Sequence, residues 1–224
     1  MNDNKTAYIP TTYDKQVMKT IPYYNLFHET TIDLVTNANI KVHSWLDIGC
    51  GTGTFIKKAK EIFVETQFVL ADPSIKMLDL ARSKINSKSK ITLIVSDSQN
   101  LDYKDESFDV ITAIQSHHYM SKTERVKAIN NCYRMLKNNG ILIVFENIMP
   151  LSNDGVKIGL KRWGNYQLRN GKAINEINQH IDRFGKEYFP ISIIEHINLL
   201  NKVGFRSVEI LWTSYMQALF YAIK

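Results

Sequence analysis

The stretch WLDIGCGTGTFIKKA, residues 45–59, places three glycines at alternate positions between an apolar run and an amphipathic one. Residues 42–48 are short and apolar, as in a buried strand, and residues 55–63 carry apolar side chains at helical spacing. A strand therefore runs into a helix through the glycines. Because ligands of open parallel sheets bind beyond the carboxyl ends of the strands, we predict a binding site at this loop rather than an ordinary tight turn.

The alternation of strand and helix continues along the chain. Further strands are predicted at residues 67–71, 91–95, 108–114 and 141–145, and helices at residues 74–85, which Ser74 caps, and 123–136. Asn138, Asn139 and Gly140 predict a turn before the fifth strand. Five strands that alternate with helices predict an α/β fold with a parallel sheet covered on both faces.

The rhythm changes after Pro150. Residues 151–190 are polar and carry seven Lys or Arg against four Asp or Glu, and we interpret them as a helical insertion rather than a separate domain. Residues 192–203 predict an amphipathic helix that Gly204 ends, followed by a closing pair of strands at 207–212 and 217–222.

Composition sets the class of protein. At 224 residues, with 44% hydrophobic and 22% charged residues, the chain predicts one globular domain. No apolar run reaches the roughly 18 residues of a membrane span, and the first ten residues lack a signal peptide's apolar segment, so we expect a cytoplasmic protein. Cys50 and Cys132 predict buried thiols, with no disulfide framework and no metal site. The net charge of +6 leaves a nucleic-acid partner as an alternative to a solvated basic surface.

The glycine spacing separates two ligand classes. A dinucleotide fold requires G-x-G-x-x-G, whereas here the spacing is G-x-G-x-G and Thr54 holds the sixth position. This loop, preceded by Asp47, resembles motif I of the class I S-adenosylmethionine-dependent methyltransferases. The resemblance covers residues 42–150 strongly and the ends weakly. It implies a three-layer, Rossmann-like sandwich whose mostly parallel seven-stranded sheet has an antiparallel strand near the C-terminus, with a helical cap insertion.

The resemblance also implies the residues that bind S-adenosylmethionine. Asp72 would accept hydrogen bonds from the ribose hydroxyls, although a helix cap beside Ser74 is an alternative role, and Met77 or Leu78 would face the adenine. Asp97 and Ser98 would meet the adenine edge. The methionine end would contact Asp47, Gln115 and Tyr13. For Tyr13, packing in the core is an alternative role. The predicted cofactor residues are Tyr13, Asp47, Gly49, Gly51, Gly53, Asp72, Pro73, Met77, Asp97, Ser98 and Gln115.

On the acceptor side, His118 is the candidate general base, or else a residue that only shapes the pocket. Tyr119 would border the acceptor. Glu146 and Asn147 would hold a polar group of the acceptor or make a loop hydrogen bond. The insertion would contribute Trp163 and Arg183, with Arg162 and His180, to the binding of an anionic or planar molecule. Alternatively, these residues would form a solvated helical surface. Residues 115–118 read QSHH and not the N-P-P-Y type that nucleobase methylases use.

We therefore predict in-line methyl transfer from S-adenosylmethionine to a small-molecule acceptor by a single domain. Its segments are an N-terminal helical cap at 1–40, a cofactor-binding core at 41–150, the insertion at 151–190, and a final helix with closing strands at 191–224. Alternatives are an RNA or tRNA methyltransferase, an NAD-dependent oxidoreductase, and a non-catalytic binding protein or one that takes a modified sulfonium. The sequence leaves the oligomeric state open.

Overall fold

A computed structural model describes residues 3, 6–85 and 90–224 of the chain. Residues 1–2 and 4–5 of the predicted N-terminal cap, and residues 86–89, lie outside the described residues. A seven-stranded sheet has the order β3-β2-β1-β4-β5-β7-β6. Its strands are β1 (Ser44–Ile48), β2 (Gln67–Asp72), β3 (Ile91–Val95), β4 (Phe108–Ile114), β5 (Leu136–Asn147), β6 (Ser207–Ser214) and β7 (Gln217–Ile223).

Strands β1 to β5 are mutually parallel, and β7 is antiparallel to both of its neighbours. The predicted mostly parallel sheet with one antiparallel strand is therefore confirmed. The helices are α1 (Tyr13–Thr20), α2 (Tyr24–Asn37), α3 (Thr54–Ile62), α4 (Ile75–Lys84), α5 (Lys122–Met135), α6 (Asn153–Arg169), α7 (Ile174–Asp182) and α8 (Ile193–Val203), with short 3-10 turns η1 (Pro10–Thr12) and η2 (His117–Tyr119).

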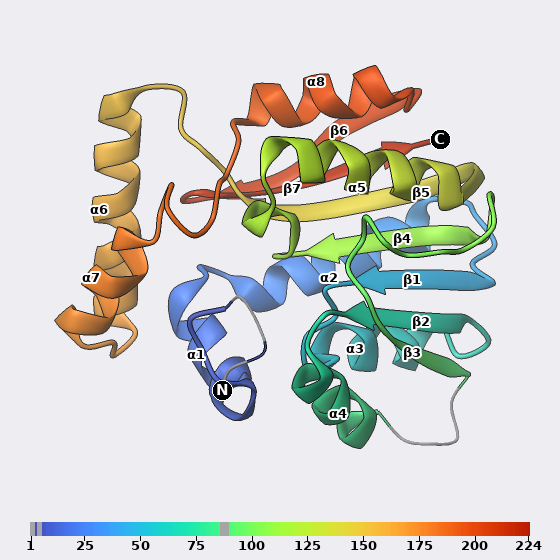
Figure 1. Ribbon diagram of the computed structural model, residues 1–224, viewed down its shortest axis with the longest axis horizontal. Helices are drawn as coiled ribbons and strands as arrows, with labels where there is room; N and C mark the ends of the chain where they lie inside the picture. Colours follow the sequence, from blue (N-terminus) through green and yellow to red (C-terminus); the bar gives the residue numbers. More distant parts are fainter. Residues whose placement is uncertain (1–2, 4–5, 86–89) are drawn as a thin grey trace.

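Helices cover both faces of the sheet and give three layers (Figure 1). Successive residues of a strand point to opposite faces, so Trp45 of β1 packs in one buried cluster with α2, α3 and α4, while Leu46 packs in the other with α5 and α8. Both cysteines are buried and free, as predicted. Among the described residues, every helix is too short or too polar to cross a lipid bilayer.

The segment before the fifth strand differs from its prediction. Helix α5 ends at Met135 and β5 begins at once with Leu136, so the predicted turn at 138–140 lies inside the strand. Asn139 has a left-handed φ of 65°, and the pairing of β4 with β5 shifts register between Phe108 and Val110. The turn-forming residues therefore produce an irregularity within a longer strand, because strand pairing continues on both sides of it.

The carboxyl ends of β1, β2 and β4 point toward one edge of the sheet, and α1, α6 and α7 lie beyond that edge (Figure 1). Helices α6 and α7 belong to the predicted insertion, and its helical character is confirmed. The N-terminal segment and the insertion, far apart in sequence, therefore lie together where a parallel sheet binds its ligands.

Candidate functional site

A cleft, here the strand-end cleft, opens where β1, β2, β3 and β4 end. It encloses about 140 Å³, and adjoining spaces that share its lining extend it on two sides. Ten of the predicted site residues lie together in its wall. The lining residues are Thr6, Tyr13, Ile48, Gly49, Gly51, Asp72, Pro73, Met77, Asp97, Ser98, Gln115, Ser116, His117, Tyr119 and Met120.

Each of the three glycines of the loop has a positive φ. They differ in what a side chain at each position would contact. A Cβ on Gly49 would lie 2.5 Å from the Ser116 Cβ, whereas the position at Gly51 has only Tyr13 near, at 4.0 Å. A Cβ on Gly53 would approach Ala81 and Ile85, both at 3.0 Å, and Gly53 lines none of the described cavities. The predicted cofactor contact of Gly53 is therefore corrected: its missing side chain lets α3 begin close to α4.

Replacing Gly53 by alanine tests this packing role. Gly171 has a similar φ, 77° against 72°, but nothing within 4 Å of its missing Cβ, so Gly171→Ala is a control for backbone strain alone. We expect Gly53→Ala to lower the free energy of unfolding by about 1–3 kcal/mol more than the control, since the overpacked Cβ displaces α4. Urea unfolding of both variants measures the difference, and equal losses would contradict the assignment.

Asp72, the last residue of β2, is 7% exposed and faces the cleft. Its Oδ2 accepts the backbone N–H of Gly51 and its Oδ1 that of Ser74, each at 2.9 Å. Burial raises the pKa of this carboxyl. Each carboxylate oxygen has a second lone pair, so these bonds leave acceptors for a ligand's hydroxyl groups. Ser74 itself caps α4 through Met77 N, so Asp72 also supports the turn into that helix.

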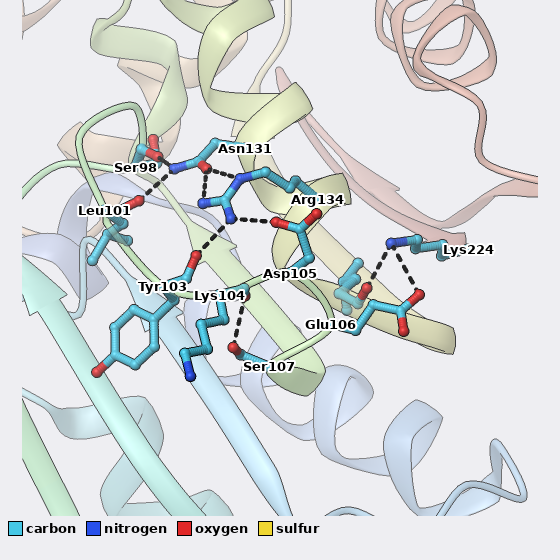
Figure 2. Close-up of polar contacts among 11 residues, drawn as sticks. Ser98, Leu101, Tyr103, Lys104, Asp105, Glu106, Ser107, Asn131, Arg134 and Lys224 are labelled. Atoms are coloured by element: carbon cyan, nitrogen blue, oxygen red, sulfur yellow. Dashed lines mark hydrogen bonds and ion pairs between the residues drawn. The ribbon is translucent and has the colours of Figure 1, made fainter.

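Asp97 and Ser98 follow β3 in a loop that α5 holds in place. Figure 2 shows Asn131 of α5 donating to the carbonyl oxygens of Ser98 and Leu101, at 2.8 and 2.9 Å. Arg134, one turn further on, donates to Tyr103 O and pairs with Asp105 (Figure 2). These bonds fix the loop backbone that presents Asp97 and Ser98 to the cleft.

Helix α1 closes the cleft from the N-terminal side. Asp14 accepts hydrogen bonds from Thr52 and Thr54 of the glycine loop, at 2.6 and 3.0 Å, and pairs with Lys84 of α4 at 2.6 Å. These contacts hold the neighbouring Tyr13 against the cleft, where it lines both the strand-end cleft and the adjoining spaces.

Asp47 lies beside the strand-end cleft rather than in its wall. It lines the adjoining space with Tyr13, Gly49 and Gly51, and it accepts a 2.6 Å hydrogen bond from Thr112 Oγ1. Burial raises the pKa of Asp47 to about 7; the Thr112 bond lowers it, and the charge of Asp72 adds to the rise. An ammonium group bound nearby would restore the ionised form.

The raised pKa predicts how stability depends on pH. Because the folded pKa of about 7 lies above the ordinary 3.8, the folded chain keeps a proton that the unfolded chain releases, and stability falls as pH rises through about 7. Between about pH 5 and pH 8, we expect the free energy of unfolding to fall less in Asp47→Asn than in the wild type. The difference should exceed about 1.4 kcal/mol, the free energy that corresponds to a shift of one pKa unit. Urea unfolding at both pH values measures it, with the exposed Asp79→Asn as control. Parallel pH curves for wild type and Asp47→Asn would contradict it.

The loop after β4 supplies unpartnered polar atoms to the cleft. Among the described residues, Gln115 Nε2, Ser116 Oγ and both ring nitrogens of His117 are buried without a hydrogen-bond partner. Gln115 also holds a left-handed φ of 54°. Buried polar groups without partners are costly, so these atoms fit a site that binds a polar ligand. Sequence analysis missed Ser116 and His117, although both directly follow Gln115.

Two further cavities continue from the cleft toward the insertion. The inner cavity, about 40 Å³, shares Thr6, Tyr13, Gln115 and Tyr119 with the cleft. The outer cavity, about 900 Å³, is lined by Thr6, Ala7, Tyr8, Ile9, Thr12, Gln16, Tyr119, Lys172, Glu176, Gln179, His180, Arg183, Lys186, Glu187 and Phe189. Tyr119 and Arg183, predicted to contact the acceptor, line the outer cavity, and both also line the inner one.

His118 lines the inner cavity and is held by Glu146 of β5. The His118 Nδ1 lies 2.8 Å from Glu146 Oε2, and Glu146 also accepts the backbone N–H groups of His117 and His118. Burial raises the pKa of Glu146, but the neighbouring histidines outweigh it and lower the pKa to about 2. Glu146 is 1% exposed and lines no described cavity, so its predicted contact with the acceptor is corrected: it orients His118 and the loop.

The predicted acceptor contact of Trp163 is the third to be corrected. Its side chain is fully buried, and its Nε1 donates to Thr20 O at 2.6 Å, so it packs α6 on α1 and lines none of the described cavities. Arg162 instead stacks over the Tyr215 ring, at 4.9 Å. His180 does line both cavities, and burial lowers its pKa to about 3.

Comparison with known proteins decides the class of this domain. Residues 46–140 match the family model described as a methyltransferase domain. Residues 46–140 therefore carry a methyltransferase domain, on the fold that S-adenosylmethionine-dependent methyltransferases share. S-adenosylmethionine is its cofactor, as the glycine spacing indicated against NAD.

Relatives of this methyltransferase extend over most of its length. It is 24% identical to the carboxy-S-adenosyl-L-methionine synthase of Nautilia profundicola, covering 96% of this chain and 92% of the relative. It is 28% identical to the enzyme of that name from Helicobacter pylori strain HPAG1, covering 92% and 87%. Human N-acetylserotonin methyltransferase, solved in complex with S-adenosylmethionine, shares the fold with a TM-score of 0.63 and 13% identity over 90% of this chain and 55% of the human one.

Proposed function

We propose that the methyltransferase transfers a methyl group to a small-molecule acceptor in the inner cavity, with His118 as general base. The observation that carries the proposal is the buried His118–Glu146 pair, because His118 lines a cavity that shares four residues with the strand-end cleft. A reacting atom at that junction could lie next to both the cofactor's methyl group and the His118 ring.

The cofactor would lie along the strand-end cleft. Asp72 would bind the ribose hydroxyls and Asp97 the adenine amino group, with Ser98 N on a ring nitrogen and Met77 and Pro73 against the ring. The methionine portion would lie over Gly49 and Gly51 toward Tyr13, Gln115 and the Asp47 carboxylate. The orphaned polar atoms of Gln115 and Ser116 and the open position at Gly51 support this fit.

The bound cofactor supplies a methyl group on a positively charged sulfur that is a good leaving group. In the transfer, the acceptor's lone pair would form a bond to the methyl carbon while the carbon–sulfur bond would break and leave its electron pair on sulfur. With Nδ1–H donated to Glu146, the free lone pair of His118 is on Nε2, which takes the acceptor's proton. In-line positioning within about 3–3.5 Å supplies most of the remaining rate enhancement.

A labelled methyl donor tests the proposal. The protein is incubated with metabolite extracts and isotopically labelled S-adenosylmethionine, and mass spectrometry searches for a labelled small molecule. We expect a labelled product and stoichiometric S-adenosylhomocysteine, both formed about 100- to 10,000-fold more slowly by the His118→Asn variant. Label found in RNA, or no label in any fraction while the cofactor binds, would overturn small-molecule methylation.

A second candidate is carboxylation of the cofactor itself. The relatives named carboxy-S-adenosyl-L-methionine synthases cover more than nine-tenths of this chain, and Lys172, Arg183 and Lys186 line the outer cavity, where an anionic carboxyl donor would fit. The same mass spectra separate the two candidates. Methyl transfer yields a labelled acceptor, whereas this reaction yields a cofactor heavier by a carboxyl group.

A further inference from the structure

Lys172 lies between α6 and α7 and is 4% exposed, yet no carboxylate of the described residues pairs with it. Its Nζ donates to the Tyr8 hydroxyl at 2.6 Å and to Thr20 Oγ1 at 3.2 Å, and it lies 4.5 Å from the centre of the Tyr8 ring. A buried ammonium without a counter-charge is costly. The third N–H of the ammonium has no acceptor among the described residues.

The position of this ammonium connects the two cavities. Lys172 lines the outer cavity, while Tyr8 and Thr20, to which it donates, both line the inner one. His118 and Gln115 also line the inner cavity. A molecule with its anionic group at Lys172 would therefore extend its body toward the proposed reaction point.

Of the other charged groups of the outer cavity, Lys186 is exposed, and three are engaged with one another or with the backbone. Arg183 pairs with Glu187 at 2.6 Å, and Glu176 accepts the Ala173 N–H at 2.9 Å as a helix cap. Lys172 is thus the buried cation of this cavity whose charge the described protein groups leave uncompensated. Aromatic rings of Tyr8, Tyr119 and Phe189 line the same cavity and suit a planar body.

We propose that Lys172 binds the carboxylate of the small molecule that this site takes, and that this molecule is a compact aromatic carboxylate. The binding of a carboxylate at Lys172 does not depend on the proposed function. Only the reaction of the bound molecule rests on that function. The carboxylate pairs with the ammonium while Tyr8 and Thr20 hold the ammonium in place. A methyl acceptor and a carboxyl donor would share this chemistry.

Matched probes test the proposal without turnover. Calorimetry in the presence of S-adenosylhomocysteine compares benzoate with benzamide, salicylate with salicylamide, and nicotinate with nicotinamide. We expect the wild-type protein to bind at least one carboxylate more tightly than its amide. In Lys172→Met the carboxylate affinity should fall by about 10- to 100-fold, while the amide affinity stays within about 3-fold, because only the charge-assisted bond is lost. Lys161→Met, an exposed lysine of α6, should behave as wild type.

Each remaining outcome counts against the proposal. Equal or better binding of every amide by wild type, no binding of any probe, or a carboxylate preference that survives in Lys172→Met would overturn it. The wild-type comparison stands even if Lys172→Met fails to fold, which thermal unfolding reveals. A carboxylate preference without any labelled methyl product would sustain this site and refute methyl transfer, so the two failures are distinguishable. Labelled product and carboxylated cofactor then identify the molecule as acceptor or donor.

Discussion

Replacement of His118 by asparagine is expected to lower kcat for methyl transfer by about 100- to 10,000-fold, the range that a general base contributes. Affinity for S-adenosylmethionine should change by less than about 3-fold, because His118 lines the inner cavity and not the strand-end cleft. Single-turnover rates with the labelled acceptor and calorimetry with the cofactor measure the two quantities.

Glu146→Gln sharpens this test. The variant keeps the shape of Glu146 but removes the charge that holds His118, so we expect a smaller loss of kcat than in His118→Asn. The double variant should be no slower than His118→Asn, since residues that act as a unit are not additive. His43→Asn, at an exposed histidine, is the control. A His118→Asn enzyme that keeps a third or more of wild-type kcat would refute the base.

The second large effect concerns the cofactor. We expect Asp72→Asn to weaken S-adenosylmethionine binding by about 100-fold, because the neutral amide loses charge-assisted acceptance from two ribose hydroxyls. The amide oxygen can still accept one of the two backbone bonds now made to Gly51 and Ser74, so thermal unfolding is followed in parallel. Calorimetry measures the affinity.

Asp79→Asn is the matched control for this variant. Asp79 lies on α4, its side chain is 62% exposed, and it pairs only with Arg82 among the described residues. Its substitution changes the net charge by the same amount at a distance from the cleft. If the two variants bound S-adenosylmethionine equally well, Asp72 would have no part in recognising it.

The strand ends could be predicted from sequence because they follow from local patterns. The alternation of apolar strands with amphipathic helices fixes the order of the elements, and parallel strands bring their carboxyl ends to one edge. Asp72, Asp97 and Gln115, each at or just beyond a strand end, therefore lie together in the structure. The turn predicted at 138–140 lies inside β5, because β4 pairs with Leu136 before it and with Ile141 after it.

The acceptor side could not be predicted in this way, because contacts between distant segments build it. Trp163 donates a hydrogen bond to Thr20, 143 residues away in the sequence. Trp163 is therefore a core residue, although it was predicted to contact the acceptor or to lie on a solvated surface. Glu146 meets His118 across 28 residues, and Lys172 meets Tyr8 across 164. The packing of Gly53 on α4 depends likewise on how two helices meet. Residue type and spacing carry no signal for such contacts.

A crystal structure with bound S-adenosylmethionine tests the central claim most directly. The account predicts the ribose hydroxyls on the Asp72 carboxylate, the adenine between Met77 and the Asp97–Ser98 loop, and the methyl group directed past Gln115 into the inner cavity toward His118. A cofactor bound elsewhere, or with its methyl group directed away from that cavity, would contradict it.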